Sequence, residues 1–143
     1  MKHAEQQIVV GGSPQECFDA LVDYDSFPDW QRAVKAVEVV TRDRKGRGEQ
    51  VSFEIDAKVR TINYTLRYAY EPPHRISWDY VEGDVKDVDG EFVLEDQGDG
   101  TTLATYSLAL DPGVWLPGPL QKVLNDQVMK GSVEDLKRRV ESS

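Results

Sequence analysis

Apolar residues follow a helical period near the start of the chain and a strand period through its middle. A short strand is predicted over residues 4–10, and the apolar residues of 16–24 then recur at helical spacing. From Val37 to residue 111, apolar and polar positions alternate instead, which is typical of strands that bury one face. The pattern therefore predicts one strand, a helical region and then a run of antiparallel strands.

The first helix carries a clear start signal. Ser13 is a good N-cap, Pro14 suits the first helical position, and Glu16 completes a capping box. Pro28 interrupts any continuation of this helix. We therefore expect a second short helix over residues 27–33.

The remaining elements are predicted from turn signals and periodicity. Gly-rich or Pro-rich turns separate six strands, predicted over residues 37–43, 49–59, 60–70, 75–83, 87–97 and 101–111. A long C-terminal helix is predicted to begin near Pro119 and to run for roughly 20 residues. Its apolar stripe consists of Leu120, Val123, Leu124, Val128, Leu136 and Val140.

A curved antiparallel sheet with one apolar face needs a cover, and the C-terminal helix is the only predicted element long enough to supply it. The sequence thus indicates an α+β fold of about six to seven strands wrapped around that helix, with two short helices after the first strand. We expect a single domain over residues 1–143.

Several segments resemble one known superfamily. The stretch "SPQECFDALVDYDSFPDW", the Gly-rich turn before residue 49, the "GDGTT" hairpin and the amphipathic C-terminal helix are similar to those of START/Bet v 1-like (SRPBCC) proteins. Within that superfamily the chain most resembles the polyketide cyclase/dehydrase and coenzyme Q-binding START-domain group. The resemblance implies a helix-grip fold with a cavity between sheet and helix, in a superfamily of lipid carriers, cyclases and regulators.

Aromatic residues are concentrated on the predicted inner face of the sheet. A buried tyrosine hydroxyl needs a hydrogen-bond partner, so several inward tyrosines suit a cavity that holds water or a polar-headed hydrophobic ligand. The alternative is that these hydroxyls reach the sheet edge and solvent. The candidate ligand-binding residues are Trp30, Phe53, Tyr64, Tyr68, Trp78, Tyr80, Phe92, Tyr106, Trp115, Leu124 and Val128.

Three of these assignments leave alternatives open. Trp30 shares a helix face with Phe27, and it either closes the core or lines one end of the cavity. Trp115 lies on a loop rich in proline and glycine, and it either gates the cavity or caps the core. Gly131 in the C-terminal helix either permits close helix–sheet packing or leaves room for a ligand. A bulge at Gly90 or near residues 82–84 would reverse the faces of the residues after it.

Composition narrows the function classes. The 143 residues carry 26 acidic and 17 basic side chains, a net charge of −9, which disfavours phosphate-tracking nucleic-acid binders. The single cysteine, Cys17, is interpreted as a small buried hydrophobe, and no internal disulfide is possible. No apolar run is long enough for a membrane span and no secretory signal is visible, so a cytoplasmic location is expected.

The sequence suggests no catalytic or metal site. His3 and His74 lie apart from any carboxylate cluster, and no nucleotide-binding loop is present, so no metal or cofactor is expected. In the cyclases that the chain resembles, an inward arginine usually participates, but the alternation places Arg67 on the outer face. An enzyme is therefore less favoured than a binding protein.

The leading hypothesis is binding of a hydrophobic small molecule, such as a lipid, isoprenoid quinone or polyketide, in an aromatic-lined cavity. The first alternative is a polyketide aromatase/cyclase-type enzyme that uses tyrosine hydroxyls in the same cavity. The second is a regulatory protein of the ribosome-associated kind. The sequence leaves open whether the chain is a monomer or a homodimer.

Overall fold

The fold consists of one curved sheet whose concave face is covered by helices. The computed structural model describes residues 2–56, 60–113, 119 and 128–142. Its elements are β1 (Lys2–Val10), α1 (Pro14–Val22), η1 (Tyr24–Ser26), α2 (Phe27–Trp30), β2 (Val34–Arg42), β3 (Gly48–Asp56), β4 (Thr61–Glu71), β5 (Arg75–Gly83), β6 (Asp87–Asp96), β7 (Thr102–Asp111) and α4 (Lys130–Glu141). The predicted α+β architecture is confirmed.

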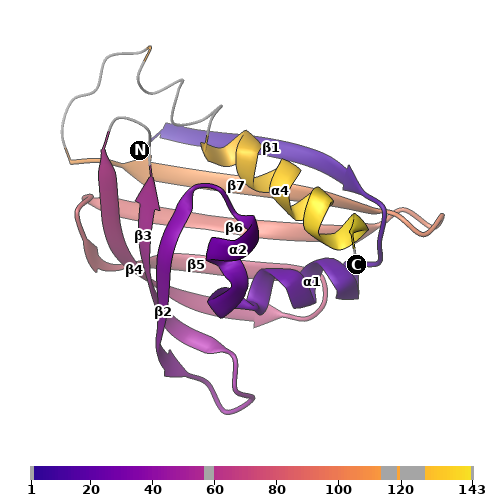
Figure 1. Ribbon diagram of the computed structural model, residues 1–143, viewed down its shortest axis with the longest axis horizontal. Coiled ribbons are helices and arrows are strands. Elements are labelled where there is room, and N and C mark those ends of the chain that lie inside the picture. The colour runs from indigo at the N-terminus through magenta and orange to yellow at the C-terminus, as the bar shows by residue number, and fades with distance from the viewer. Residues whose placement is uncertain (1, 57–59, 114–118, 120–127, 143) are drawn as a thin grey trace.

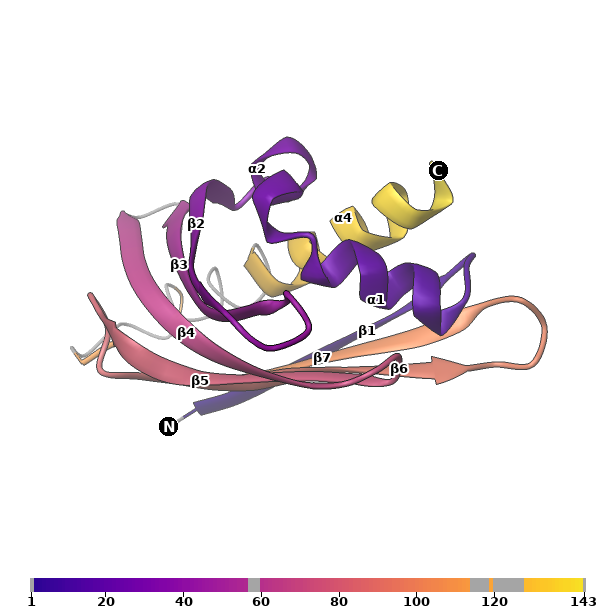
Figure 2. The same ribbon diagram turned by 90° about the horizontal axis from the view of Figure 1, so that it is seen from below.

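The sheet has seven strands in the order β1-β7-β6-β5-β4-β3-β2, and every neighbouring pair is antiparallel. Figure 1 shows α4 lying along β1 and β7, with α1 and α2 nearer the strands at the other edge. Viewed from below, the sheet bends strongly and all three helices occupy its concave side (Figure 2). This curvature encloses an interior between the sheet and the helices.

The start of α1 matches its sequence signal. The Ser13 hydroxyl accepts from the Glu16 backbone N–H at 3.1 Å, and the Glu16 carboxylate accepts from the Ser13 backbone N–H at 3.2 Å. Both orphan donors at the helix start are thereby satisfied. The apolar face of α1 then buries Cys17, Phe18 and Leu21.

The second helical region differs from the prediction. A 3₁₀ turn precedes α2, which ends at Trp30 rather than at residue 33, and β2 begins at Val34 rather than at Val37. The Gln31 backbone N–H donates to the Phe27 carbonyl and the Val34 N–H donates to the Gln31 carbonyl, which turns the chain directly into the strand. Gln31 is polar and makes these bonds through its backbone, so the hydrophobic pattern of the sequence does not reveal the boundary between α2 and β2.

The C-terminal helix is described from Lys130 onward, and residues 120–127 of its predicted span lie outside the described residues. Leu136 and Val140 of the predicted stripe are buried, together with Val133. Gly131 has ample space, because a Cβ atom there would meet only the Arg32 guanidinium at 3.8 Å. Close packing is therefore not the reason for this glycine, and Gly131 is not among the described residues that line the cavity.

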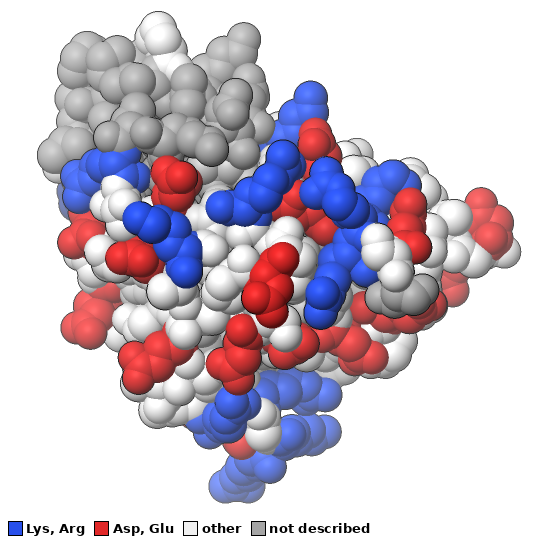
Figure 3. Space-filling view, viewed as in Figure 1, with Lys and Arg blue, Asp and Glu red and all other residues white. Residues whose placement is uncertain are grey.

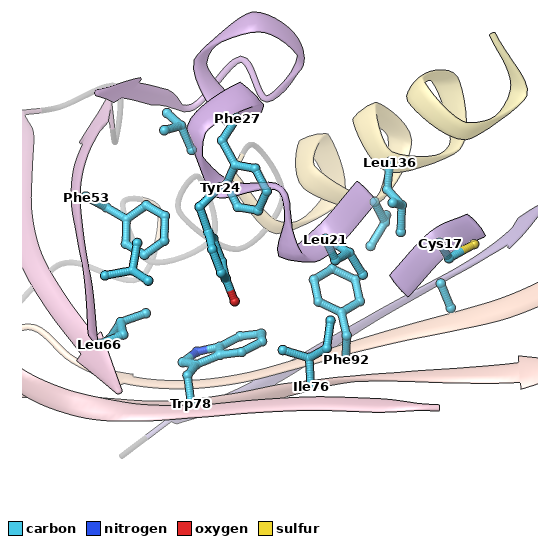
Figure 4. Close-up of a cluster of buried hydrophobic side chains, with 14 of the residues drawn as sticks. Cys17, Leu21, Tyr24, Phe27, Phe53, Leu66, Ile76, Trp78, Phe92 and Leu136 are labelled. Carbon is cyan, nitrogen blue, oxygen red and sulfur yellow. The ribbon is translucent and has the colours of Figure 1, made fainter. Parts of the chain in front are cut away.

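Of the two places where the sequence left strand parity in doubt, Gly90 keeps its register and the segment near residues 82–84 does not. No register shift occurs at Gly90, whereas one occurs between Thr65 and Leu66, opposite the segment that leads to residues 82–84. The side chains of Val51, Phe53 and Ile55 on β3 and of Ile76 and Trp78 on β5 therefore all face the interior. Figure 4 shows Phe53, Ile76 and Trp78 of the sheet pointing toward Leu21, Tyr24 and Phe27 of the helices.

Most of the described charged side chains lie on the outside, and Asp135 is buried. On the face seen in Figure 3, acidic and basic residues are interspersed over the helices and the strand ends. None of the described helices is long and apolar enough to cross a membrane.

Candidate functional site

A cavity of about 90 Å³ lies between the concave face of the sheet and the helices. This volume corresponds to about three water molecules. The described residues that line it are mostly apolar or aromatic: Leu21, Tyr24, Phe27, Gln31, Ala33, Val34, Phe53, Ile55, Tyr64, Leu66, Tyr68, Ile76, Trp78, Val88, Phe92, Tyr106, Leu108, Val128 and Ser132. The cavity is thus built from the sheet, the short helices and the start of the C-terminal helical region.

Aromatic rings form a continuous belt around this cavity. The Tyr68 ring centroid lies 5.8 Å from that of Trp78, and the Trp78 centroid lies 5.7 Å from that of Tyr106. Phe92 stacks on Tyr106 at 4.6 Å, and Tyr24 lies 4.9 Å from Tyr68. These separations suit offset and edge-to-face ring contacts, so the rings of the belt pack directly against one another.

Three tyrosines of the belt present free hydroxyls. Among the described residues, the hydroxyls of Tyr64, Tyr68 and Tyr106 have no hydrogen-bond partner, although all three residues line the cavity. In contrast, the Tyr24, Tyr70 and Tyr80 hydroxyls are bonded within the protein. A buried phenol that has no protein partner favours the binding of a ligand or water that can accept a hydrogen bond from it.

Burial keeps these phenols protonated. Desolvation raises the pKa of Tyr64 to about 12. It also raises the pKa of Tyr68 well above its ordinary value, with a further contribution from Tyr64, and the pKa of Tyr106 likewise. At neutral pH all three groups are therefore hydrogen-bond donors and weak acids, and none is a base.

The belt contains most of the residues expected from the sequence. Seven of the eleven candidates line the cavity: Phe53, Tyr64, Tyr68, Trp78, Phe92, Tyr106 and Val128. Six of them lie on β3 to β7, whose alternation places every second residue on the concave face, and Val128 lies just before α4. Tyr64, Tyr68 and Tyr106, three of the tyrosines expected to face the cavity, are among these lining residues.

Two candidates lie elsewhere in the described structure. The Trp30 ring packs edge-on against Phe27 at 5.3 Å, and Trp30 does not line the cavity, which fits the core-closure alternative. The Tyr80 hydroxyl donates to the Val85 carbonyl at 2.6 Å and turns away from the cavity. Trp115 and Leu124 lie outside the described residues.

Several lining residues on the helical side, among them Leu21, were not among the candidates. Tyr24 and Phe27 come from the "DYDSFPDW" segment, where Tyr24 is 2% exposed and reaches toward the sheet (Figure 4). The high aromatic content of that acidic segment was the available signal. Gln31 and Ser132 are polar, and nothing in a hydrophobic pattern distinguishes them from surface residues.

A polar cluster stands at the helical end of the cavity. The Ser132 hydroxyl on α4 donates to Gln31 Oε1 at 3.2 Å. One helical turn further, buried Asp135 accepts from the Arg32 backbone N–H and from Arg32 Nε, each at 2.9 Å, and from Arg138. These bonds fasten the turn between α2 and β2 to the C-terminal helix.

Charged groups are absent from the described cavity lining. Arg67, on the central strand β4, is exposed on the outer face, as its parity predicted. Among the described residues, no group of three or more His, Cys, Asp or Glu side chains is arranged to hold a metal ion. The described site can therefore donate hydrogen bonds and stack on rings, but it offers no ionised group.

Sequence comparison identifies a family over nearly the whole chain. The model of the family described as "Polyketide cyclase / dehydrase and lipid transport" matches residues 1–141. No curated protein sequence matches the chain.

Solved structures share this fold at low sequence identity. A START superfamily protein from Mycobacterium smegmatis aligns with a TM-score of 0.89 and 20% identity, covering 98% of this chain and 97% of its own. The Zhui aromatase/cyclase from Streptomyces sp. R1128 aligns with a TM-score of 0.81 and 17% identity, covering 98% and 93%. The di-domain aromatase/cyclase BexL from the BE-7585A biosynthetic pathway aligns with a TM-score of 0.74 and 22% identity, covering 99% of this chain and 47% of its own. At these identities the likeness establishes the helix-grip fold.

Proposed function

We propose that this chain, which belongs to the polyketide cyclase/dehydrase and lipid transport family, binds a hydrophobic small molecule in the cavity between its sheet and helices. The observation that carries the proposal is the aromatic belt with the phenols of Tyr64, Tyr68 and Tyr106, which have no hydrogen-bond partner among the described residues. An apolar wall with a few convergent polar groups is the usual composition of a small-molecule site.

The cavity size restricts what can enter. Ligand pockets usually have volumes of about 300–1,000 Å³, and this cavity has about 90 Å³. A compact bicyclic molecule, or one end of a larger lipid, quinone or polyketide, therefore enters with rotation of wall side chains. Leu108 is a suitable wall residue to move, because it is only half-buried and borders the cavity.

The test is native mass spectrometry of freshly purified protein, with solvent extraction of any adduct. We expect a hydrophobic adduct that dissociates on unfolding. Leu108→Phe adds bulk inside the cavity and should abolish the adduct, whereas Leu103→Phe makes the same change on the outer face of β7, beside exposed Val9, and should retain it. The same spectra distinguish a monomer from a homodimer.

Binding of added probes covers the case in which no ligand co-purifies. We expect isothermal titration to detect 1-tetralone, a compact bicyclic ketone, with wild-type protein and with Leu103→Phe but not with Leu108→Phe. A wild-type protein that carries no adduct and binds neither 1-tetralone nor the parent hydrocarbon tetralin would contradict the proposal.

A cyclase-type activity is the second candidate, and the protonated phenols favour it. Phenols with raised pKa values can donate to a ketone oxygen and stabilise the enolate that forms from it. Enolate formation also needs a base, and the described lining contains no carboxylate, histidine or lysine. Turnover of a poly-β-ketone that is lost in Tyr68→Phe, with ligand binding retained, would establish the enzyme instead of the binding protein.

A further inference from the structure

We infer that the side-chain amide of Gln31 is a specificity-determining hydrogen-bond donor that selects ligands carrying a carbonyl oxygen. The inference rests on the proposed binding function and assigns a role to a residue outside the aromatic belt. Gln31 is only 7% exposed and lines the cavity at its helical end. Buried glutamine is uncommon, because each amide atom must find a partner away from water.

The hydrogen bonds of Gln31 are satisfied except at one atom. Its backbone N–H donates to the Phe27 carbonyl at 2.8 Å, and its backbone carbonyl accepts from the Val34 N–H at 3.0 Å. Its side-chain Oε1 accepts from the Ser132 hydroxyl at 3.2 Å. Among the described residues, Nε2 has no acceptor, so two N–H donors remain at the cavity wall.

The amide is held in position before any ligand arrives. Ser132 fixes Oε1, and the adjacent residue Arg32 is bonded to Asp135 through both its backbone N–H and its Nε. Asp135 is 2% exposed, and it lies three residues after Ser132 on α4. Because α4 is bonded both to Gln31 Oε1 and to the adjacent Arg32, little conformational entropy is lost when Nε2 meets an acceptor.

The polar groups around the cavity point to one ligand chemistry. Nε2 of Gln31 and the phenols of Tyr64, Tyr68 and Tyr106 are all donors at neutral pH, and no charged side chain lines the described cavity. Donors without a counter-charge suit a neutral molecule with carbonyl oxygens. A site built to bond such an oxygen discriminates against the analogue that lacks it, since its donors are then left buried and unpaired.

A matched pair of probes tests this selection. 1-Tetralone and tetralin share the same bicyclic skeleton, and only tetralone carries a carbonyl oxygen. We expect wild-type protein to bind tetralone more tightly. Gln31→Met keeps the length of the side chain without its donors, so it should weaken tetralone binding about three- to tenfold and leave tetralin binding unchanged. Gln15→Met makes the same substitution at an exposed site on α1 and should preserve the wild-type preference.

The outcomes separate this inference from the function on which it rests. An unchanged ratio of tetralone to tetralin affinity in Gln31→Met would overturn the role of Gln31 and leave the binding function intact. If neither probe binds the wild-type protein, the inference fails, and if that protein also carries no adduct, the binding function fails with it. If circular dichroism shows that Gln31→Met is unfolded, Gln31→Glu replaces it, and its carboxylate, which has no donor at neutral pH, should reduce the same ratio.

Discussion

The hydroxyls of Tyr24 and Tyr70 lie 2.7 Å apart and connect the short helices to the sheet. The Tyr70 hydroxyl donates to the Gly48 carbonyl, which can only accept, so the Tyr24 hydroxyl must donate to Tyr70. Gly48 also lets the Tyr24 ring approach, because a Cβ there would lie 3.0 Å from that ring. One directed chain of hydrogen bonds thus holds η1, β4 and β3 together beside the cavity.

The direction of this chain predicts unequal costs for two similar substitutions. Tyr70→Phe leaves both the Gly48 carbonyl and the Tyr24 hydroxyl without this partner, and should lower the free energy of unfolding by about 1–3 kcal/mol. Tyr24→Phe removes one donor and leaves the Tyr70–Gly48 bond intact, so it should cost about 0.5–1.5 kcal/mol. Urea denaturation measures both, and equal costs, or a larger cost for Tyr24→Phe, would contradict the assigned direction.

Periodicity was sufficient to predict the sheet and the aromatic belt. Strand alternation placed Phe53, Tyr68 and Tyr106 on one face, and the antiparallel pairing brings those faces together. The helical side was less predictable. The position of Gln31 at the cavity depends on its backbone hydrogen bonds in the turn after α2 and on its bond from Ser132, which lies 101 positions away in the sequence. Neither contact produces a periodic pattern of hydrophobic residues.

The sequence predicts the face of the sheet on which a tyrosine ring lies better than it predicts the hydrogen-bond partner of the hydroxyl. Tyr68 and Tyr80 follow the same alternation, yet the Tyr80 hydroxyl bonds to the Val85 carbonyl whereas that of Tyr68 stays free among the described residues. A register shift in β4–β5 lies next to Tyr80, and only its approximate position could be anticipated from the sequence.

Gly90 and Gly131 should respond to alanine in opposite directions. A Cβ at Gly90 would lie 2.6 Å from the Ser107 carbonyl oxygen and 2.8 Å from the Trp78 indole, so Gly90→Ala should destabilise the protein by about 1–3 kcal/mol. At Gly131 in α4 the nearest atom is 3.8 Å away, so Gly131→Ala should stabilise it by about 0.5–1 kcal/mol. Thermal unfolding of both variants provides the comparison, and a neutral Gly90→Ala would show that the sheet can spread there.

The Cys17 thiol should be inert in the folded protein. It is 0% exposed, and burial raises its pKa to about 11, so the reactive thiolate is scarce at pH 8. We expect no reaction with Ellman's reagent in buffer and one thiol per chain in urea. Labelling at the same rate in buffer and in urea would mean that α1 opens readily from the sheet.

The cavity tyrosines should make the protein sensitive to alkali. Tyrosine in an unfolded chain has a pKa of about 10, whereas burial raises the pKa of Tyr64 to about 12. The folded state therefore holds this proton more tightly, its contribution to stability is complete below pH 10, and it is lost as pH rises from 10 toward 12. For Tyr64 alone the loss is about 1.4 kcal/mol at pH 11.

Tyr64→Phe isolates that contribution because the hydroxyl of Tyr64 has no partner among the described residues. Between pH 9 and pH 11 the variant should lose about 1.4 kcal/mol less stability than the wild-type protein, and between pH 6 and pH 8 the two should change in parallel. Urea denaturation at each pH gives the free energies, and absorbance at 295 nm follows phenol ionisation. Identical alkaline slopes would mean that Tyr64 already ionises in the folded protein near pH 10, and the cavity would then be wetter than its ring contacts indicate.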